Sequence, residues 1–354
     1  MSNDQSVATG PAHYRLTVKA IREETSDAKS FVLVPERGEA PLFRYTPGQF
    51  LSFRIPFQGR NITRSYSLSS APGADPDMRI CVKRVKDGRG SNWFNDHLSA
   101  GARIEATVPS GRFVLRDRDA PLLLIAGGSG ITPCISLLKK ALLETGRQVR
   151  LIYANRDASS IIYHNELELL QKKFSGRLDC VHRLDDRDGF LTQEDVISLA
   201  RGWHDADTYI CGPAPLMDMA ENTLTDALGD RAYIMTERFV SPDDDVAKTP
   251  DATQDTGPQE APINDFRLTL DGVDHMVPYK AGQTLLQAAL DAGIDAPVSC
   301  TEGHCGTCMS ALKSGKVQMA TTKALSKRNL ERGYVLACQS RPCATETLWL
   351  DFDL

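Results

Sequence analysis

The sequence lacks the features that mark membrane, secreted and nucleic-acid-binding proteins. It contains no run of 18 apolar residues, which a transmembrane helix would need. Its polar first 15 residues lack the apolar core of a signal peptide. It also lacks a basic excess, because 41 Lys and Arg residues face 46 Asp and Glu residues, for a formal net charge of -5. We therefore expect a cytoplasmic protein that binds neither a membrane nor nucleic acid.

Disulfide bonds are not expected either, although the chain has nine cysteines. Without a secretion signal, cysteines more often bind metal or carry redox chemistry. Three scattered ones, Cys81, Cys134 and Cys180, are predicted to be small buried apolar residues. Four others follow the pattern Cys-x4-Cys-x2-Cys with a fourth cysteine after 29 intervening residues: Cys300, Cys305, Cys308 and Cys338.

This spacing is that of the four thiolate ligands of plant-type [2Fe–2S] clusters. Gly303 and Gly306 allow the loop to wrap closely and to present backbone N–H groups to the sulfurs. Zinc is the alternative, but zinc sites usually pair two short Cys-x2-Cys units, and only one is present here.

Two further residues near the motif could be ligands. Cys343 lies five residues after Cys338, but Cys338 ends an apolar strand and is the better held of the two. His304 raises the possibility of a Rieske centre, which needs two His ligands. Because no second His follows, we expect His304 to be a rim residue.

Upstream of this motif, the sequence contains two segments with different patterns of secondary structure. Residues 12–115 read as short strands separated by Pro, Gly and Asp, which is typical of an antiparallel barrel or sandwich. A helix at 91–100 interrupts them, with Ser91 or Asn92 as the expected N-cap. Residues 116–240 alternate apolar strands with helices, as in an α/β domain with a parallel sheet.

The C-terminal part has its own organisation. Residues 241–262 are poor in large apolar residues and are expected to form a flexible linker, with a long ordered loop as the alternative. Residues 263–354 fit a small α+β domain, in which 309–319 are expected to form a hairpin. The length of 354 residues accommodates these three domains.

A flavin site is suggested by Arg64, Tyr66 and Ser67. A Tyr ring can stack on an isoalloxazine, a Ser hydroxyl can bond the N5 region, and an Arg can neutralise a phosphate. Alone, the motif would be an ordinary strand. Downstream, a glycine-led helix start could bind phosphate through free N–H groups; its residues are Gly90, Ser91 and Asn92.

A nucleotide site is suggested by a Gly-rich turn between an apolar strand and a helix. The turn contains Gly128, Gly130 and Thr132, but Pro133 replaces the third glycine of the usual dinucleotide fingerprint. A tight turn without a ligand is the alternative. A second motif ends a later strand, and its residues are Cys211, Gly212 and Pro213.

Together these motifs make residues 12–240 similar to the ferredoxin–NADP reductase superfamily, and residues 263–354 resemble plant-type ferredoxins of the β-grasp fold. The resemblance implies a β-barrel flavin domain, with Ser67 and Cys211 as catalytic residues where hydride passes from nicotinamide to flavin. The glycine-led helix favours FAD over FMN. Phe239, at the end of the second domain, is expected either near the flavin face or in the core.

The choice of coenzyme depends on two adjacent residues. Arg156 could bind the 2′-phosphate of NADPH by a charge-assisted pair, whereas Asp157 could bind a 2′-hydroxyl and repel phosphate. Most fused reductases of this architecture use NADH, so the resemblance implies NADH, with NADPH as the alternative.

The domain order resembles reductase components of bacterial multicomponent oxygenases. It implies electron transfer from NADH to FAD, to the [2Fe–2S] cluster and to a partner, expected to be a Rieske-type hydroxylase or demethylase of betaine-like compounds. A hybrid-cluster protein and a di-iron epoxidase or hydroxylase are alternative partners. A self-contained small-molecule enzyme is disfavoured because nothing outside the three modules could hold a substrate domain. We expect the chain to be monomeric by itself.

Overall fold

The computed structural model describes residues 12–229, 233–239, 263–344 and 347–354. The chain divides into two compact units, one spanning 13–239 and the other containing the C-terminal residues from 240 onward. The predicted linker at 241–262 lies outside the described residues.

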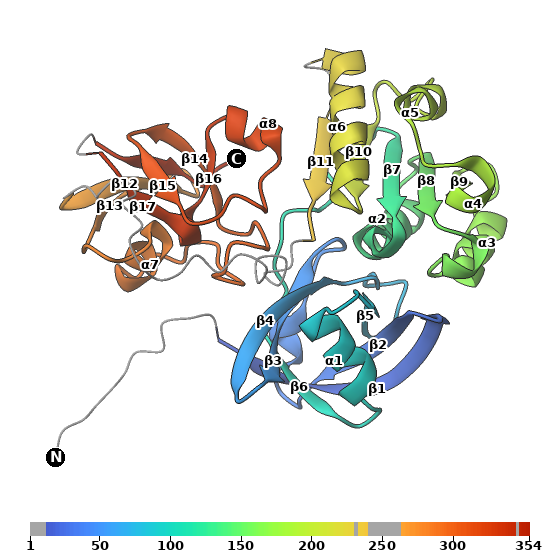
Figure 1. Cartoon of the computed structure of the whole chain (residues 1–354), viewed down its shortest axis with the longest axis horizontal. Coiled ribbons are helices and arrows are strands. Elements are labelled where there is room, and N and C mark those ends of the chain that lie inside the picture. Colours follow the sequence, from blue (N-terminus) through green and yellow to red (C-terminus); the bar gives the residue numbers. More distant parts are fainter. Residues whose placement is uncertain (1–11, 230–232, 240–262, 345–346) are drawn as a thin grey trace. The chain divides into compact units, whose positions relative to one another are not determined.

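The first part of the larger unit is an antiparallel barrel (Figure 1). Its strands follow the order β4-β3-β6-β1-β2-β5, and a bridge between Leu68 and Ile80 joins the two ends of this order. The rings of Phe31, Phe53 and Phe94 meet edge to face inside it, with centroids 5.5 and 5.2 Å apart. Its elements are β1 (Tyr14–Thr25), β2 (Ala28–Pro35), β3 (Phe50–Phe57), β4 (Arg60–Ser67), β5 (Met78–Lys83), α1 (Arg89–His97) and β6 (Arg103–Ala106), with a 3-10 turn at Ala40–Phe43.

The N-cap expected for α1 was wrong. The helix begins at Arg89 with Gly88 as its N-cap, so Ser91 and Asn92 lie within its first turn. The Ser91 hydroxyl instead accepts the backbone N–H of Val85 at 3.1 Å, which ties the preceding loop back to the helix. A Cβ at Gly88 would lie 2.6 Å from the Ser91 Oγ, so this close loop requires glycine there.

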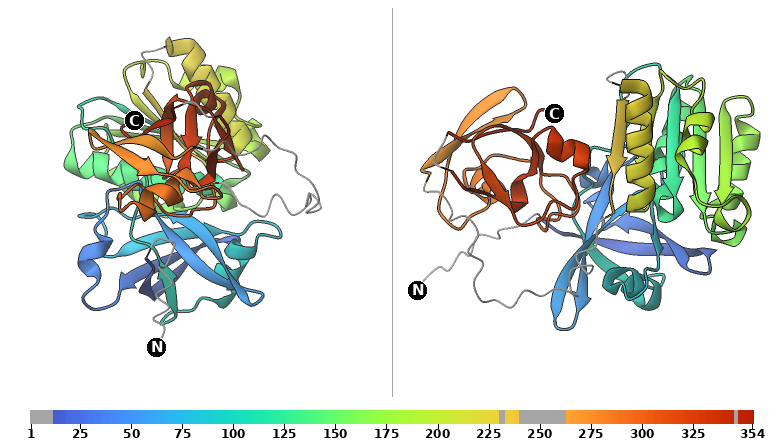
Figure 2. Two further views of the ribbon diagram at one scale, coloured as in Figure 1. Left: turned by 90° about the vertical axis from the view of Figure 1, so that its left-hand side faces the viewer. Right: turned by 45° about the horizontal axis from the view of Figure 1, so that its top comes forward.

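The second part of the larger unit is a parallel sheet in the order β11-β10-β7-β8-β9. Leu122 and Leu124 face a core shared with α2 and α3, whereas Leu123 and Ile125 face one shared with α5 and α6, so helices cover both faces. Figure 2 shows α6, in yellow, lying along this sheet. A short helix at Asp185–Asp188, α4, was not anticipated. The other elements are β7 (Leu122–Gly127), α2 (Ile131–Glu144), β8 (Val149–Asn155), α3 (His164–Lys173), β9 (Leu178–Leu184), α5 (Gln193–Leu199), β10 (Asp207–Cys211), α6 (Ala214–Leu228) and β11 (Tyr233–Glu237).

The C-terminal unit has a five-stranded mixed sheet in the order β13-β12-β18-β14-β16 and a separate two-stranded sheet of β15 and β17. Helix α7 packs its Leu285, Leu286 and Ala289 into the core of this unit. Its elements are β12 (Asp265–Leu270), β13 (Val273–Pro278), α7 (Leu285–Asp291), β14 (Met309–Ser314), β15 (Val317–Met319), α8 (Lys327–Glu331), β16 (Tyr334–Leu336), β17 (Ser340–Pro342) and β18 (Trp349–Asp351).

The hairpin expected at 309–319 was wrong, although both of its strands exist. Strand β14 pairs with β16 and β18, whereas β15 pairs with β17 in the other sheet. The turn between them has Gly315 at a φ of 82°, and a Cβ there would meet the Cα of Leu348 at 2.9 Å. The chain therefore changes sheets at this glycine instead of folding back on itself.

Candidate functional site

The four motif cysteines form two contacting pairs in the C-terminal unit. Hydrogen bonding between Cys300 and Cys305 raises the pKa of Cys300 to about 12 and lowers that of Cys305 to about 7. Hydrogen bonding between Cys308 and Cys338 likewise raises the pKa of the first thiol and lowers that of the second. Two irons bridged by sulfide each need two protein thiolates, which matches this pairing.

A single metal ion would need a different arrangement. Within the described ranges, no three Cys, His, Asp or Glu side chains are grouped so that they could hold one ion. Cys343, the alternative fourth ligand, lies just after β17, and its backbone N–H donates to the carbonyl of Lys316 at 3.1 Å. The pairing therefore favours a two-iron cluster over zinc and keeps Cys338 as the predicted fourth ligand.

The loop around these cysteines fits a cluster in its backbone conformation. Thr301, Gly303 and Gly306 all have positive φ values, of 58°, 77° and 71°. A Cβ at Gly303 would lie 2.6 Å from a side-chain carbon of Thr321, so only glycine fits this turn. The N–H of Cys338 also points to the sulfur of Cys308 at 3.5 Å, as a donor to a ligand thiolate should.

His304 is buried, contrary to the rim position expected for it. Only 4% of the residue is exposed, although it lies between two predicted ligands. Neither ring nitrogen has a hydrogen-bond partner among the described residues. Leaving a buried polar group unpaired costs free energy, so this imidazole is suited to form a hydrogen bond with a cofactor that the cysteine loop would hold.

The flavin motif lies on β4 of the barrel and meets the start of α1. Arg64 is only 8% exposed, and a Cβ at Gly90 would lie 2.6 Å from its side-chain Cγ. The Arg64 side chain thus passes beside the first turn of α1, and a guanidinium and a helix N-terminus can both attract a phosphate. Asn92 is bound within the loop, accepting a hydrogen bond from Arg84 at 3.3 Å. The Tyr66 ring packs edge to face on Phe94, with centroids 4.9 Å apart.

Ser67, at the end of β4, is joined to a residue that the motifs did not single out. Its hydroxyl donates to Oε2 of Glu237 at 2.6 Å, across 170 positions of sequence. Burial raises the pKa of Glu237 to about 7, which the hydrogen bond from Ser67 partly opposes. A carboxyl with a pKa near neutrality can hold or release a proton under physiological conditions.

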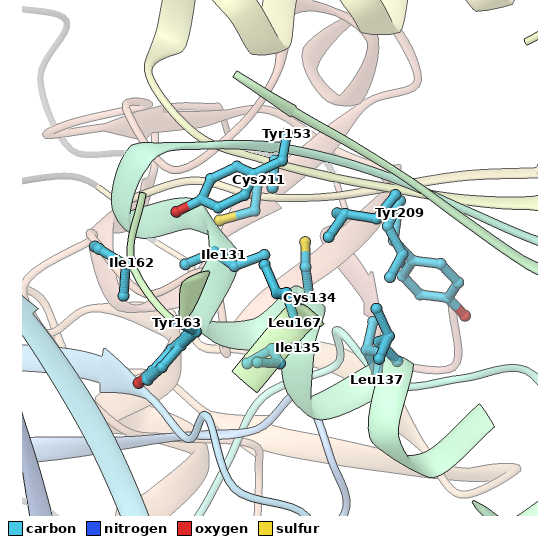
Figure 3. Packing of buried hydrophobic residues seen from close by; sticks show 14 of the residues in the cluster. Ile131, Cys134, Ile135, Leu137, Tyr153, Ile162, Tyr163, Leu167, Tyr209 and Cys211 are labelled. Atoms are coloured by element: carbon cyan, nitrogen blue, oxygen red, sulfur yellow. The ribbon is translucent and has the colours of Figure 1, made fainter. Parts of the chain in front are cut away.

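Cys211 lies next to Glu237, because the two residues are paired in the register of β10 and β11. It is fully buried, and its sulfur lies in the same apolar cluster as that of Cys134 (Figure 3). Burial, the nearby Glu237 carboxylate and Cys134 raise the pKa of Cys211 well above its ordinary value. A neutral thiol is therefore expected here, and its catalytic role stays a prediction.

The two nucleotide motifs interlock. A Cβ at Gly130 would lie 2.1 Å from the carbonyl oxygen of Cys211, and one at Gly127 would lie 2.7 Å from Cδ of Pro213. A Cβ at Gly212 would likewise lie 2.9 Å from the backbone nitrogen of Gly127. Glycine is thus required where the two turns touch, although neither motif shows this alone.

A pocket of about 590 Å³ opens beside these turns. Its walls include Gly128, Pro213, Met219 and two cationic side chains, Lys83 and Arg156. A volume of this size suits a dinucleotide portion, and the cations suit its phosphates. Gly130 and Thr132 are buried and do not line the pocket, and the Thr132 hydroxyl donates to the Ser129 carbonyl at 3.0 Å.

The two residues considered for coenzyme choice differ in position. Nη2 of Arg156 lies 3.1 Å from Oδ2 of Asp27, a carboxylate that also lies 3.8 Å from Nζ of Lys83. Asp157 uses its carboxylate to cap the following 3-10 turn, whereas Asp185 lines the pocket. The acidic group that lines the pocket is therefore Asp185, the first residue of α4 directly after β9, which sequence reasoning missed.

Phe239 lies on the surface, with 45% of the residue exposed, so the core alternative was wrong. Among the scattered cysteines, Cys81 and Cys134 are buried as expected, whereas Cys180 is only partly buried. No described helix has the length and apolarity of a membrane span.

Comparison with known proteins identifies the same three modules. The oxidoreductase FAD-binding domain matches residues 15–115, the oxidoreductase NAD-binding domain matches 124–222, and the 2Fe-2S iron-sulfur cluster binding domain matches 268–343. The ferredoxin reductase component of 3-ketosteroid-9-alpha-monooxygenase from Mycolicibacterium smegmatis is 42% identical, with 92% of this chain and 94% of the relative covered. The chain belongs to the family of ferredoxin reductase components of oxygenases.

Other relatives of this reductase component serve different systems. A component of the 1,2-phenylacetyl-CoA epoxidase from Escherichia coli is 32% identical, with 96% of this chain and 98% of the relative covered. The reductase of the glycine betaine monooxygenase from Pseudomonas aeruginosa is 29% identical, with 93% of each chain covered.

Solved structures agree on the architecture. Phthalate dioxygenase reductase is 28% identical with a TM-score of 0.59, and 96% of this chain and 98% of that chain are covered. A type IV self-sufficient cytochrome monooxygenase, 24% identical with a TM-score of 0.66, shares the fold. The reductase component covers 41% of that longer chain.

The reductase component is thus an oxidoreductase that passes electrons from NADH to FAD, to the [2Fe–2S] cluster and to a partner oxygenase. FAD supplies the step between two-electron and one-electron chemistry, because it takes both electrons of a hydride and releases them singly.

Proposed function

We propose that the partner is a Rieske-type terminal monooxygenase that hydroxylates a ketosteroid or a similarly bulky apolar compound. The observation that supports this choice of partner is sequence similarity along the whole chain. Reductase components of 3-ketosteroid-9-alpha-monooxygenases from three organisms are 38–42% identical, whereas the glycine betaine relative is 29% identical. A ketosteroid oxygenase is therefore a better supported partner than a demethylase of betaine-like compounds.

We further propose three cofactor sites within the domain boundaries 12–115, 116–240 and 263–354. Arg64 and Gly90, with Ser91 and Asn92 in the first turn of α1, bind the FAD phosphates, and Tyr66 packs against the flavin. The NADH residues are Gly128, Gly130, Thr132, Arg156, Gly212 and Pro213, with Phe239 at the flavin face. The cluster ligands are Cys300, Cys305, Cys308 and Cys338.

The residues proposed for the hydride step are Ser67, Cys211 and Glu237. Ser67 keeps its proton on Oγ and shares it with Oε2 of Glu237 at 2.6 Å, which supports a proton-holding pair at the end of β4. Cys211 borders this pair through its register with Glu237 and excludes water by its burial. Glu237 orients the Ser67 hydroxyl, and the Cys211 thiol excludes water from the adjacent part of the site.

Reconstitution tests the partner. The full-length holoprotein would be mixed with a Rieske-type ketosteroid oxygenase, NADH and a 3-ketosteroid, and the hydroxylated product would be measured against NADH consumed. Stoichiometric product is expected only when both proteins are present. Faster coupled turnover with a glycine betaine oxygenase would contradict the proposal, and product formed without any oxygenase would contradict the electron-carrier role itself.

We also propose that the chain is monomeric by itself and works in the cytoplasm. Light scattering of the purified holoprotein would measure the mass directly. A mass of twice 38.9 kDa would contradict the monomer.

A further inference from the structure

His304 combines burial with the lack of a hydrogen-bond partner beside the predicted cluster ligands. The residue is 4% exposed, and neither Nδ1 nor Nε2 has a partner in the described part of the chain. The nearest carboxylate oxygen, Oε2 of Glu302, is 3.7 Å from Nδ1, which is beyond hydrogen-bonding distance. Native proteins rarely leave a buried ring N–H unpaired, so a missing acceptor is implied.

The position of the ring indicates which acceptor this is. His304 directly precedes the predicted ligand Cys305, and the predicted ligands Cys300 and Cys308 of the same loop are also buried, each 3% exposed. The buried imidazole therefore belongs to the loop whose thiols are predicted to hold the cluster. The strongest acceptors at that place would be the sulfur atoms of the cluster, since thiolates and sulfides carry negative charge.

We propose that His304 donates its ring N–H to a sulfur of the [2Fe–2S] cluster and thereby raises the reduction potential of the cluster. The proposal rests on the ligand assignment above. Reduction adds one electron, supplied through FAD, and makes the cluster more negative. A donor to sulfur stabilises that reduced form more than the oxidised one. His304 is thus a positioning and tuning residue and not a ligand.

The test is the midpoint potential of the cluster in the full-length holoprotein, followed by electron paramagnetic resonance during a redox titration. His304→Leu is expected to make reduction about tenfold less favourable, which is a drop of about 59 mV for a one-electron couple. His304→Gln keeps an N–H donor and is expected to recover most of the drop. An unchanged potential in His304→Leu, at full cluster content, would overturn the proposal.

A matched control is available in the same unit. His275 lies on β13, at the opposite edge of the sheet from β16, which leads to the ligand Cys338. His275→Leu makes the same chemical change away from the cysteine loop and is expected to leave the potential unchanged. An equal drop in both variants would show a general effect of the substitution and would also overturn the proposal.

A second measurement covers the case in which His304→Leu does not retain the cluster. The unmutated protein, grown with ¹⁵N-labelled histidine, would be reduced and examined by pulsed electron paramagnetic resonance. Weak coupling between the cluster spin and a histidine nitrogen is expected from a hydrogen bond. No coupling would contradict the contact, and coupling as strong as that of an iron ligand would make His304 a ligand instead.

Discussion

Replacing Glu237 by Gln is expected to remove a pH dependence from both the stability and the NADH reaction of the protein. The carboxyl is partly buried at the end of β11 and accepts the Ser67 hydroxyl at 2.6 Å. Burial raises its pKa from an ordinary 4.5 to about 7, with Ser67 opposing the rise. Gln keeps an acceptor oxygen for Ser67 but does not titrate.

The direction in which stability changes with pH follows from the number of protons bound by the folded and unfolded states. Because the folded protein holds this proton up to about pH 7 and the unfolded chain releases it near pH 4.5, the folded state binds more protons in that window. Stability therefore falls as the pH rises from 4.5 to 7 and stays low above it. The rise in pKa corresponds to about 3 kcal/mol, and partial exposure lowers the expected loss to about 1–2 kcal/mol.

The assay follows flavin fluorescence during thermal unfolding between pH 5 and 8, together with the pH profile of kcat/KM for NADH with ferricyanide as acceptor. The parent should lose stability as the pH rises towards 7 and show an inflection in kcat/KM near pH 7, and Glu237→Gln should show neither. Glu144→Gln, an exposed change at the end of α2, is the control and should follow the parent. Parallel curves for the parent and Glu237→Gln would refute the reasoning.

Three further changes have defined outcomes. Cys305→Ser should leave NADH-to-ferricyanide activity largely intact, because flavin can serve that acceptor, while delivery to the partner oxygenase collapses; survival of both would remove the cluster from the path. Asp27→Asn frees Arg156 from its 3.1 Å ion pair, so the ratio of kcat/KM for NADPH to that for NADH should rise several-fold, as expected for a partly exposed pair. Asp27→Glu should keep the parent ratio, and a similar ratio in all three proteins would contradict this role. Gly130→Ala should abolish NADH binding, measured by titration, because its Cβ would lie 2.1 Å from a backbone oxygen, whereas Gly146→Ala meets nothing within 4 Å and should bind NADH normally.

Much of the architecture could be predicted from local sequence signals. The apolar run at 122–126 becomes the central strand β7, and the Gly-rich turn after it opens helix α2, as the pattern indicated. The cysteine spacing also led to the cluster-binding domain that the family comparison confirms. These features depend on residues close together in the sequence, where periodicity and turn chemistry are informative.

The features that sequence reasoning missed depend on distant segments. Nothing near Glu237 shows that it will accept a hydrogen bond from Ser67, 170 positions earlier. The strands β14 and β15 look like a hairpin until their partners, β16 and β17, are known. Asp185 was missed for the same reason, since only the fold of β9 beside β8 brings it to the nucleotide pocket.

The pairing of β14 with β16 has a consequence for how the cluster is assembled. Met309 is opposite Leu336 in this ladder, and the N–H of Ala337 continues it to the carbonyl of Cys308. A slip of one residue would turn the side chains of the displaced strand to the other face of the sheet and separate the two thiols that meet beside it. Strand alignment therefore sets the spacing of one iron's ligands, so a substitution in β16 that shifts this ladder would cost the protein its cluster while every cysteine stays in place.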